Sequence, residues 1–385
     1  MRFDFNPFFN PGENIAWNRV VRMFRDQTRV AEQSGFTTVW CTEHHFAHNG
    51  YLNAPPNPIL MCADLGAHFD KIRLGQAPVV LPDWHPLRVA EDIALLDNMT
   101  EGRVDFGAGR GTNERTCIQF NLDADKRNNE RNTALFQESL DIIIKAWTED
   151  PFSYQGDFYE FPVPGWKEIN RMFYPFDTRY HAEDGEYIGM YIHPRPYQKP
   201  HPPVWLMSNT PATYERAGAL DMHVVGVTSA PDKLKACWQA YRKGAAVGQG
   251  KALRCGEGVA LCVAIYVAET MEAADRDIRA SLNHYYEYVV GARPSGWGRS
   301  SFLNDGESLT IADRDADWYD FLRSHDLIWV GTADHVGEKL QHYREEFGLE
   351  HVMLLQQFPG TPLKKILASM TRFGEQVLPQ FLVNP

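Results

Sequence analysis

The chain has 385 residues, of which 44% are hydrophobic and 23% are charged, and its formal net charge is −12. This charge repels polyanions and no dense run of Lys and Arg offsets it, which argues against a nucleic-acid partner. No uncharged apolar stretch is long enough to span a membrane and the N-terminus lacks a signal-peptide pattern, so we expect a cytoplasmic protein.

Short β-rich runs alternate with longer amphipathic stretches, which is typical of β/α units around a parallel sheet. Strands are predicted at residues 2–6, 37–42, 72–81, 104–108, 204–207, 223–227, 258–267 and 351–356. Helices are predicted at residues 17–34, 58–67, 85–98, 129–147, 211–219, 231–246, 271–290, 332–347 and 362–378. Two irregular stretches, 148–203 and 291–326, read as insertions. The first could frame a pocket or an oligomer contact, and the second could be a lid or a plain surface loop.

Eight strands with intervening helices predict an α/β fold, a TIM (β/α)8 barrel, as a single domain over residues 1–385. A doubly wound sheet is the rival, but it normally has G-x-G-x-x-G after its first strand, where this chain reads NPFFNPGEN. In a barrel, chemistry lies at the C-terminal ends of the strands. This rule selects the segments Glu43–His45, Ala77–Pro78, Pro82–His85, Gly107–Gly111, Ser208–Thr213 and Gln356–Gln357.

Two adjacent histidines follow the second predicted strand, in the run Glu43-His44-His45. Neighbouring side chains point to opposite sides of the backbone, so one can face the barrel mouth while the other packs or caps. A histidine there titrates near neutrality and can move protons. The alternative is that the histidine has no catalytic role and is only a hydrogen-bonded residue at the rim of the barrel. Because no third ligand stands at H-x-x-x-H spacing, we expect no metal.

Two segments have the residue types of an anion site. The run GAGRG after the fourth predicted strand lets backbone N–H groups approach an anion, and Arg110 adds a guanidinium. In the segment Ser208–Thr213, Thr210 suits the N-cap of a helix and Pro211 its first position. Hydroxyls and free N–H groups would then meet at a helix N-terminus. Ordinary capping explains Thr210 equally well, but Arg110 and Arg131 add weight to a phosphate site.

A proline stands inside the third predicted strand, in the run GQAPVVLP. Proline cannot donate to the strand ladder, so we expect a bulge or a cis bond at Ala77–Pro78. A tolerated kink is the alternative.

Taken in order, these motifs resemble the bacterial luciferase-like monooxygenase family. The matching stretches are GFTTVWCTEHHF, KIRLGQAPVVLPDWHPLRVAEDIALLDNMTEGRVDFGAGRG, NNERNTALFQESLDIIIKAW, PPVWLMSNTPATYERAG, VGTADHVGEKL and HVMLLQQFPG. They cover most of the chain outside the two insertions. The resemblance implies a TIM barrel that binds FMN at its C-terminal mouth.

The resemblance also implies roles for single residues. Flavin-binding positions are Ala77, Pro78, Arg110, Arg131, Ser208, Asn209, Thr210 and Thr213. The arginines and threonines among them match positions at the flavin phosphate, and Ala77–Pro78 matches a cis peptide against the flavin ring. His44 matches a histidine at the reactive edge of the flavin, so we expect His44 and Glu43 to be catalytic. Whether His45 or His48 contributes stays open.

The family mechanism implies a two-component system. A separate flavin reductase supplies FMNH2, O2 adds to the flavin to give a 4a-hydroperoxide, and this species oxygenates an apolar organic substrate. We also expect a homodimer. Two alternatives stay open: a deazaflavin-dependent oxidoreductase of the same fold, and a non-catalytic flavin-binding relative.

Overall fold

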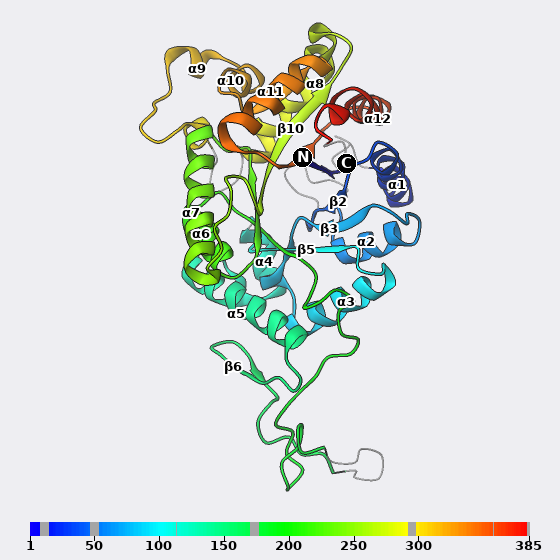
Figure 1. Cartoon of the computed structure of the whole chain (residues 1–385), viewed down its shortest axis with the longest axis vertical. Helices are drawn as coiled ribbons and strands as arrows, with labels where there is room; N and C mark the ends of the chain where they lie inside the picture. The colour runs from blue at the N-terminus through cyan, green and yellow to red at the C-terminus, as the bar shows by residue number, and fades with distance from the viewer. Residues whose placement is uncertain are drawn as a thin grey trace. The chain divides into compact units, whose positions relative to one another are not determined.

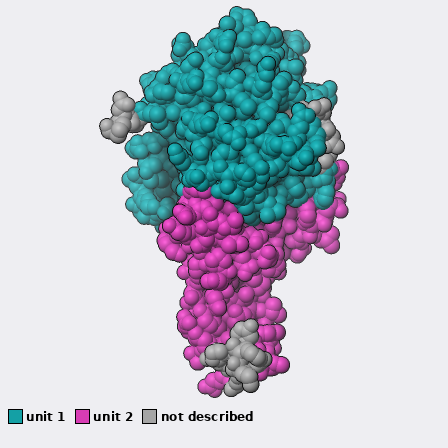
Figure 2. All heavy atoms as spheres, turned by 90° about the vertical axis from the view of Figure 1, so that its right-hand side faces the viewer, with its two compact units in different colours: residues 1–79, 105–107, 203–385 teal, residues 80–104, 108–202 magenta. Residues whose placement is uncertain are grey.

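The computed structural model describes residues 1–7, 15–46, 54–112, 114–169, 177–291, 298–356 and 358–382. It contains two compact units, coloured separately in Figure 2. Unit 1 comprises residues 1–79, 105–107 and 203–385, and unit 2 comprises residues 80–104 and 108–202. The single domain expected over the whole chain stays a prediction. None of the described helices combines the length and the apolar character that a membrane crossing requires.

Eight parallel strands close into a barrel, which confirms the predicted TIM fold. They are β1 (Arg2–Asn6), β2 (Thr38–Cys41), β3 (Arg73–Gln76), β5 (Val104–Gly109), β8 (Val204–Met207), β9 (His223–Val227), β10 (Val259–Val267) and β12 (His351–Leu355). Each strand pairs with the next in this order, and β12 pairs with β1 to close the ring. The closing register places Arg2 opposite His351 and Asn6 opposite Leu355.

Helices of unit 1 surround these strands (Figure 1). They include α1 (Trp17–Gln33), α2 (Pro58–Gly66), α6 (Pro211–Ala219), α7 (Pro231–Gln249), α8 (Met271–His284), α11 (Ala333–Phe347) and α12 (Leu363–Arg372). In α1 the buried residues Val20, Phe24, Thr28 and Ala31 recur every three or four positions, which gives one apolar stripe. The stripe explains why this segment packs as a helix.

Unit 2 contains α3 (Pro86–Met99), α4 (Glu114–Phe120), α5 (Asn129–Thr148) and the strand pair β6 (Tyr154–Gln155) and β7 (Glu160–Phe161). The helices α3 and α5 pack together, and the Trp147 indole N–H donates to the Ala90 carbonyl at 2.9 Å. The Glu138 carboxylate accepts the backbone N–H groups of residues 157–159 at 2.8–3.0 Å, which fixes the strand pair to α5.

The structure differs from the sequence-based prediction in several places. The stretch 148–203 contains the strand pair β6 and β7, and the unpredicted helix α4 follows β5. The third predicted strand is interrupted: β3 ends at Gln76, and only β4 (Val79–Val80) and a 3-10 turn, η1 (Leu81–Asp83), follow Pro78. The stretch 291–326 is not irregular throughout, because it contains η4 (Arg299–Phe302), α9 (Ile311–Asp315) and α10 (Trp318–Ser324). An unpredicted strand, β11 (Ile328–Gly331), pairs with β10 outside the ring.

The ends of several predicted helices also differ in form. Residues 285–290 and 373–377 are π-helical continuations, η3 (Tyr285–Val290) and η5 (Phe373–Val377), and 3-10 turns form η2 (Leu122–Ala124) and η6 (Leu378–Gln380). Cys255 is half-buried, whereas the other five cysteines are buried.

Side chains alternate along β1 between the outside and the inside of the barrel. Phe3 packs outward against Phe373. Asp4 points inward, where its carboxylate accepts from the Trp40 indole at 2.8 Å and the His351 ring at 2.7 Å. Period-two alternation therefore places the even-numbered residues of β1 inside the barrel.

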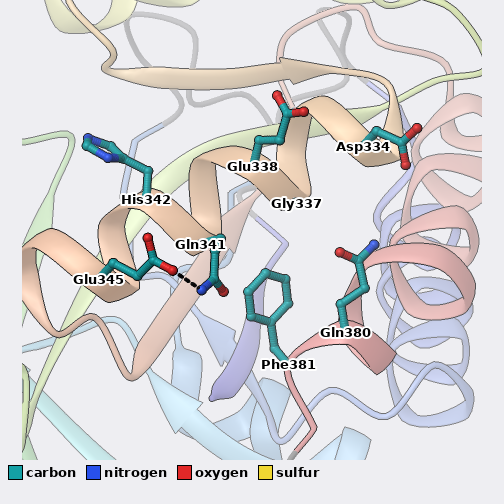
Figure 3. Close-up of a pocket in the computed structure, with 8 residues that line it drawn as sticks. All are labelled: Asp334, Gly337, Glu338, Gln341, His342, Glu345, Gln380 and Phe381. Atoms are coloured by element: carbon teal, nitrogen blue, oxygen red, sulfur yellow. Dashed lines mark hydrogen bonds between the residues drawn. The ribbon is translucent and has the colours of Figure 1, made fainter.

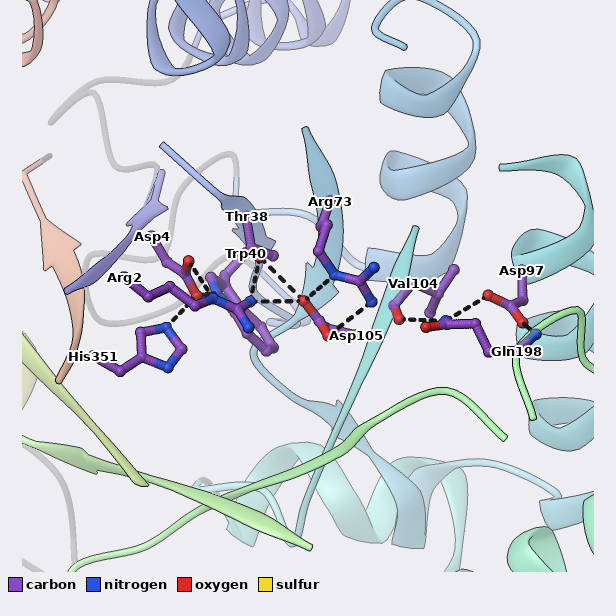
Figure 4. Close-up of polar contacts among 10 residues, drawn as sticks. All are labelled: Arg2, Asp4, Thr38, Trp40, Arg73, Asp97, Val104, Asp105, Gln198 and His351. Atoms are coloured by element: carbon purple, nitrogen blue, oxygen red, sulfur yellow. Dashed lines mark hydrogen bonds and ion pairs between the residues drawn. The ribbon is translucent and has the colours of Figure 1, made fainter. Parts of the chain in front are cut away.

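The amino-terminal end of the barrel interior holds a network of charged side chains (Figure 4). Arg2 donates to Asp4 at 3.0 Å and to Asp105 at 2.9 Å, and Arg73 donates twice to Asp105 at 3.0 Å. Burial opposes ionisation of Asp4, but the charges and hydrogen bonds of His351 and Arg2 outweigh it and hold the pKa of Asp4 at about 2. In a barrel this end serves stability rather than catalysis.

Candidate active site at the carboxyl ends of the strands

The predicted histidine pair lies directly after β2. The Glu43 side chain is fully buried, and its carboxylate forms a 2.8 Å hydrogen bond with Nε2 of His45. His44 is half-buried, and its backbone N–H donates to the Pro55 carbonyl at 2.9 Å. His45 is therefore one hydrogen-bond partner of the buried Glu43 carboxylate. His48 lies outside the described residues.

The turn after this pair is a strained one. Phe46 has a φ of 62° and is 54% exposed. A bulky side chain in the left-handed region is uncommon, and such positions cluster at functional sites. The conformation turns the chain sharply just after His45.

The Ala77–Pro78 peptide bond is cis, which confirms that alternative for the proline in the third predicted strand. The Ala77 N–H donates to the Cys41 carbonyl of β2 at 2.8 Å, so the bend begins where regular pairing ends. Next to it, a Cβ added to Gly107 would lie 1.7 Å from the Gln76 carbonyl oxygen. Only glycine fits there, because β5 approaches β3 too closely for any side chain.

Hydroxyl groups line the N-terminus of α6. Thr210 is the N-cap and Pro211 the first helical residue, as predicted, but the Thr210 side chain does not cap the helix. Its Oγ1 lies 2.9 Å from Oγ1 of Thr213 and 3.1 Å from Oγ of Ser208. The three hydroxyls therefore form a chain at a helix N-terminus, which is an arrangement suited to an anion.

Both polar atoms of the Asn209 side-chain amide form hydrogen bonds to the backbone. Its Nδ2 donates to the Val227 carbonyl and its Oδ1 accepts the Val227 N–H, both at 2.8 Å. The paired bonds tie the loop after β8 to the end of β9. The side chain of Asn209 thus positions the hydroxyl chain.

The two predicted arginines lie in unit 2 and differ in their partners. Arg110 is half-buried and donates to Asn129 at 2.9 Å and to Thr133, which are neutral groups. Burial lowers the pKa of Arg110. Arg131 is exposed, donates to Asp123 at 2.8 Å and stacks 4.8 Å above the Phe158 ring.

The helix geometry separates these arginines within unit 2. Residues 129 and 133 share one flank of α5, and residue 131 lies roughly 160–200° around the axis from them. Arg110 contacts the flank of α5 that carries residues 129 and 133. Arg131 projects from the opposite flank and forms an ion pair with Asp123. Among the described residues, Arg131 pairs with a carboxylate, whereas Arg110 contacts the neutral side chains of Asn129 and Thr133.

Several buried polar atoms lie at the barrel mouth; Gln356 belongs to a segment selected from the sequence, whereas Asn6 and Thr42 were not anticipated. Within the described part of the chain, Asn6 Oδ1, Thr42 Oγ1 and both amide atoms of Gln356 have no hydrogen-bond partner. Asn6 ends β1, Thr42 follows β2 and Gln356 follows β12, which are neighbouring strands. Such atoms are costly when buried alone, so they indicate a bound molecule or water. Asn6 and Thr42 could have been found from the sequence by selecting residues at strand ends whose side chains alternate toward the barrel interior. Gln357 lies outside the described residues.

A pocket elsewhere contains none of these residues. It has a volume of about 660 Å³ and is formed by α11 and by residues at and after η6. Figure 3 shows that polar and acidic side chains, among them Asp334, Glu338 and Glu345, dominate its lining. The candidate site is therefore the set of residues at the strand ends.

Residues 1–351 match a family model described as luciferase-like monooxygenase. The oxygenase component of a flavin-dependent trigonelline monooxygenase from Acinetobacter baylyi is 24% identical, covering 92% of this chain and 88% of that protein. The alkanal monooxygenase alpha chain of Photorhabdus laumondii is 26% identical, covering 91% and 89%.

Solved structures share the fold. Monooxygenase RslO1 from Streptomyces bottropensis has a TM-score of 0.76 at 22% identity, covering 99% of this chain and 100% of that one. The oxygenating constituent of 3,6-diketocamphane monooxygenase from Pseudomonas putida, in complex with FMN, has a TM-score of 0.75 at 19% identity, covering 100% and 99%. A coenzyme F420-dependent tetrahydromethanopterin reductase from Methanopyrus kandleri has a TM-score of 0.64 at 16% identity, covering 99% and 100%.

Proposed function

The chain belongs to the luciferase-like monooxygenase family, and on that premise we propose that it is the oxygenase component of a two-component system. It would take FMNH2 from a separate flavin reductase and use O2 to oxygenate a small apolar organic substrate. A relative named as an oxygenase component supports the separate reductase. The cytoplasmic location and the homodimer belong to the same proposal.

The observation that carries this proposal is the hydroxyl chain at the start of α6. Ser208, Thr210 and Thr213 bond mainly to one another, so each keeps capacity for a further hydrogen bond. A phosphate offers several acceptor oxygens and is favoured at the positive end of a helix. The residues present therefore fit the phosphate end of FMN.

Arg110 fits the same role better than Arg131. Its guanidinium is half-buried and contacts the neutral Asn129 and Thr133, so its charge remains available to an anion. Arg131 would first have to leave Asp123. We keep both in the proposed phosphate set and expect Arg110 to contribute more.

Reduced FMN supplies the electrons with which O2 is activated. The Ala77–Pro78 peptide would lie against its ring, and the unpartnered Asn6 Oδ1 and Thr42 Oγ1 offer hydrogen bonds inside the mouth. His44 would hold and deliver a proton at an imidazole nitrogen. Glu43, whose carboxylate binds His45, would act mainly by fixing the turn that presents His44.

A deazaflavin-dependent reaction is the second candidate, because an F420-dependent enzyme shares the fold over nearly the whole chain. The two candidates predict different ligands. Anaerobic titrations with reduced FMN and reduced F420, followed by fluorescence, separate them directly. Binding of reduced FMN in preference to F420 supports the proposal, and the opposite preference would overturn it. A protein that binds FMN but never consumes O2 with any substrate would be a non-catalytic relative.

A further inference from the structure

A pocket of about 360 Å³ lies within unit 1, beside the N-termini of α6 and α7. Thr210 borders it from α6, Thr228–Ala230 border it after β9, and Lys233 and Cys237 border it from α7. Asp305 and neighbouring residues complete the wall. The volume is in the lower part of the ~300–1,000 Å³ range of small-molecule sites, so it suits a small anion or one end of a larger ligand.

Ser229 offers an unused hydroxyl to this pocket. The residue is nine-tenths buried and lines the pocket, yet its side chain has no hydrogen bond to any described residue. It follows Thr228, which has a φ of 42°. A β-branched residue in the left-handed region costs energy, and such strain is typical of ligand-binding turns.

Lys233 supplies a positive charge that is only loosely held. Its Nζ lies 3.4 Å from the Ser301 carbonyl oxygen and 3.8 Å from an Asp305 carboxylate oxygen. Both distances exceed the ~2.7–3.2 Å of a good N–H···O bond. The Asp305 side chain is 93% exposed, so water screens its charge and an anion in the pocket can compete for Lys233.

The other groups of the pocket are compatible with negative charge. Burial raises the pKa of the Cys237 thiol to about 11, so the thiol stays neutral near pH 7. The N-terminus of α6 adds partial positive charge beside Thr210. The α7 N-terminus is capped in part by Asn304, which accepts the Asp232 N–H at 3.0 Å, and its N-cap Ala230 has no side-chain cap.

We propose that this pocket binds a phosphate monoester, held by Lys233, Ser229 and Thr210. The inference rests on the proposed function in one respect, since the phosphate of FMN is one source of this group. A free phosphate or a phosphorylated substrate is the other source. A phosphate suits the site because it accepts hydrogen bonds from several directions at once, which matches an ammonium, two hydroxyls and a helix N-terminus.

The test measures dissociation constants of FMN and riboflavin by flavin fluorescence, and of inorganic phosphate by thermal shift at constant ionic strength. The variants are Lys233→Met, Lys233→Arg and Ser229→Ala. Lys235→Met is the matched control, because Lys235 is on the same helix but contacts Glu346 and the Phe347 ring instead. Circular dichroism shows that each variant is folded.

If the proposal is right, Lys233→Met weakens FMN or phosphate binding about tenfold, the loss expected for one charge-assisted hydrogen bond. Ser229→Ala weakens it severalfold, Lys233→Arg retains most of it, and riboflavin binding does not change. Equal affinities in Lys233→Met and Lys235→Met would overturn it. If FMN fails to bind the wild-type protein but phosphate binds in a Lys233-dependent way, the pocket is confirmed and the FMN function falls.

Discussion

Replacing Asp4 with Asn should destabilise the protein strongly, although Asp4 is remote from the proposed chemistry. The carboxylate is fully buried and accepts hydrogen bonds from Arg2, Trp40 and His351 at 2.7–3.0 Å. Its pKa is about 2, against ~3.9 in an unfolded chain, and a difference of ~1.9 units corresponds to ~2.6 kcal/mol at pH 7. The amide of Asn replaces one carboxylate oxygen, which accepts a hydrogen bond, with an NH2 group that faces another donor, and this adds a cost of ~1 kcal/mol or more. We therefore expect a loss of about 3–5 kcal/mol, the range for a broken buried ion pair.

The pH dependence of that loss has a definite sign. Because the folded pKa of Asp4 lies below the unfolded one, its contribution is complete above pH ~4 and disappears as the pH falls toward 2. Urea unfolding of the wild type and Asp4→Asn, followed by tryptophan fluorescence and circular dichroism, measures the difference at pH 7, 5 and 3.5. The control Asp26→Asn, at a half-exposed surface pair with Arg29, should cost ~0.5 kcal/mol or less. A difference below 1 kcal/mol at pH 7, or one that grows on acidification, would refute the reasoning.

Three further substitutions test other parts of the structure. His44→Ala should lower product formation at least 100-fold while FMN affinity changes less than threefold, as expected for a lost proton donor; the exposed His68→Ala is the control, and full activity in His44→Ala would exclude the assigned role. Gly107→Ala should prevent stable folding, since its Cβ would meet a backbone oxygen at 1.7 Å, whereas Gly298→Ala, with nothing within 4 Å, should leave the melting temperature nearly unchanged; equal melting temperatures would contradict this. Glu138→Gln should cost about 2 kcal/mol and loosen the strand pair it holds, because three N–H groups lose a charged acceptor; hydrogen exchange of residues 154–161 would measure it, and unchanged protection would be the opposing result.

The order of strands and helices was predictable because local signals agree with the fold. Pro211 and Pro231 stand at the first positions of α6 and α7, where proline is favoured, and the short apolar runs β8 and β9 have the predicted bounds. The third strand was predicted to run to residue 81 with a bulge or a cis bond at Ala77–Pro78; the cis bond is present, but β3 ends before it at Gln76.

The stretch 291–326 shows the limit of periodicity. Helices α9 and α10 have five and seven residues, too few for a repeating apolar stripe. Their signals are caps instead: Thr310 and Asp313 form a capping box, and Asp317 caps α10. Whether any part of this stretch acts as a lid remains a prediction.

The candidate site was predicted in part. The residues that were missed come together only through contacts between segments that are distant in the sequence. Thr210 and Thr213 were recognisable from a helix start after a strand. Ser229 and Lys233 stand near an ordinary helix start, and only the tertiary packing shows the pocket that they share with Thr210. Arg131 was grouped with Arg110 by resemblance, and the helix geometry distinguishes them.

We propose that this protein transfers an oxygen atom from O2 to an organic substrate with electrons from reduced FMN. The most direct measurement supplies FMNH2 from an unrelated flavin reductase under 18O2, with a panel of apolar carbonyl, sulfide and ring compounds, and analyses products by mass spectrometry. We predict a product that carries one 18O atom and that depends on both FMN and this protein. A product formed without label, or only with F420 and no O2, would contradict the account.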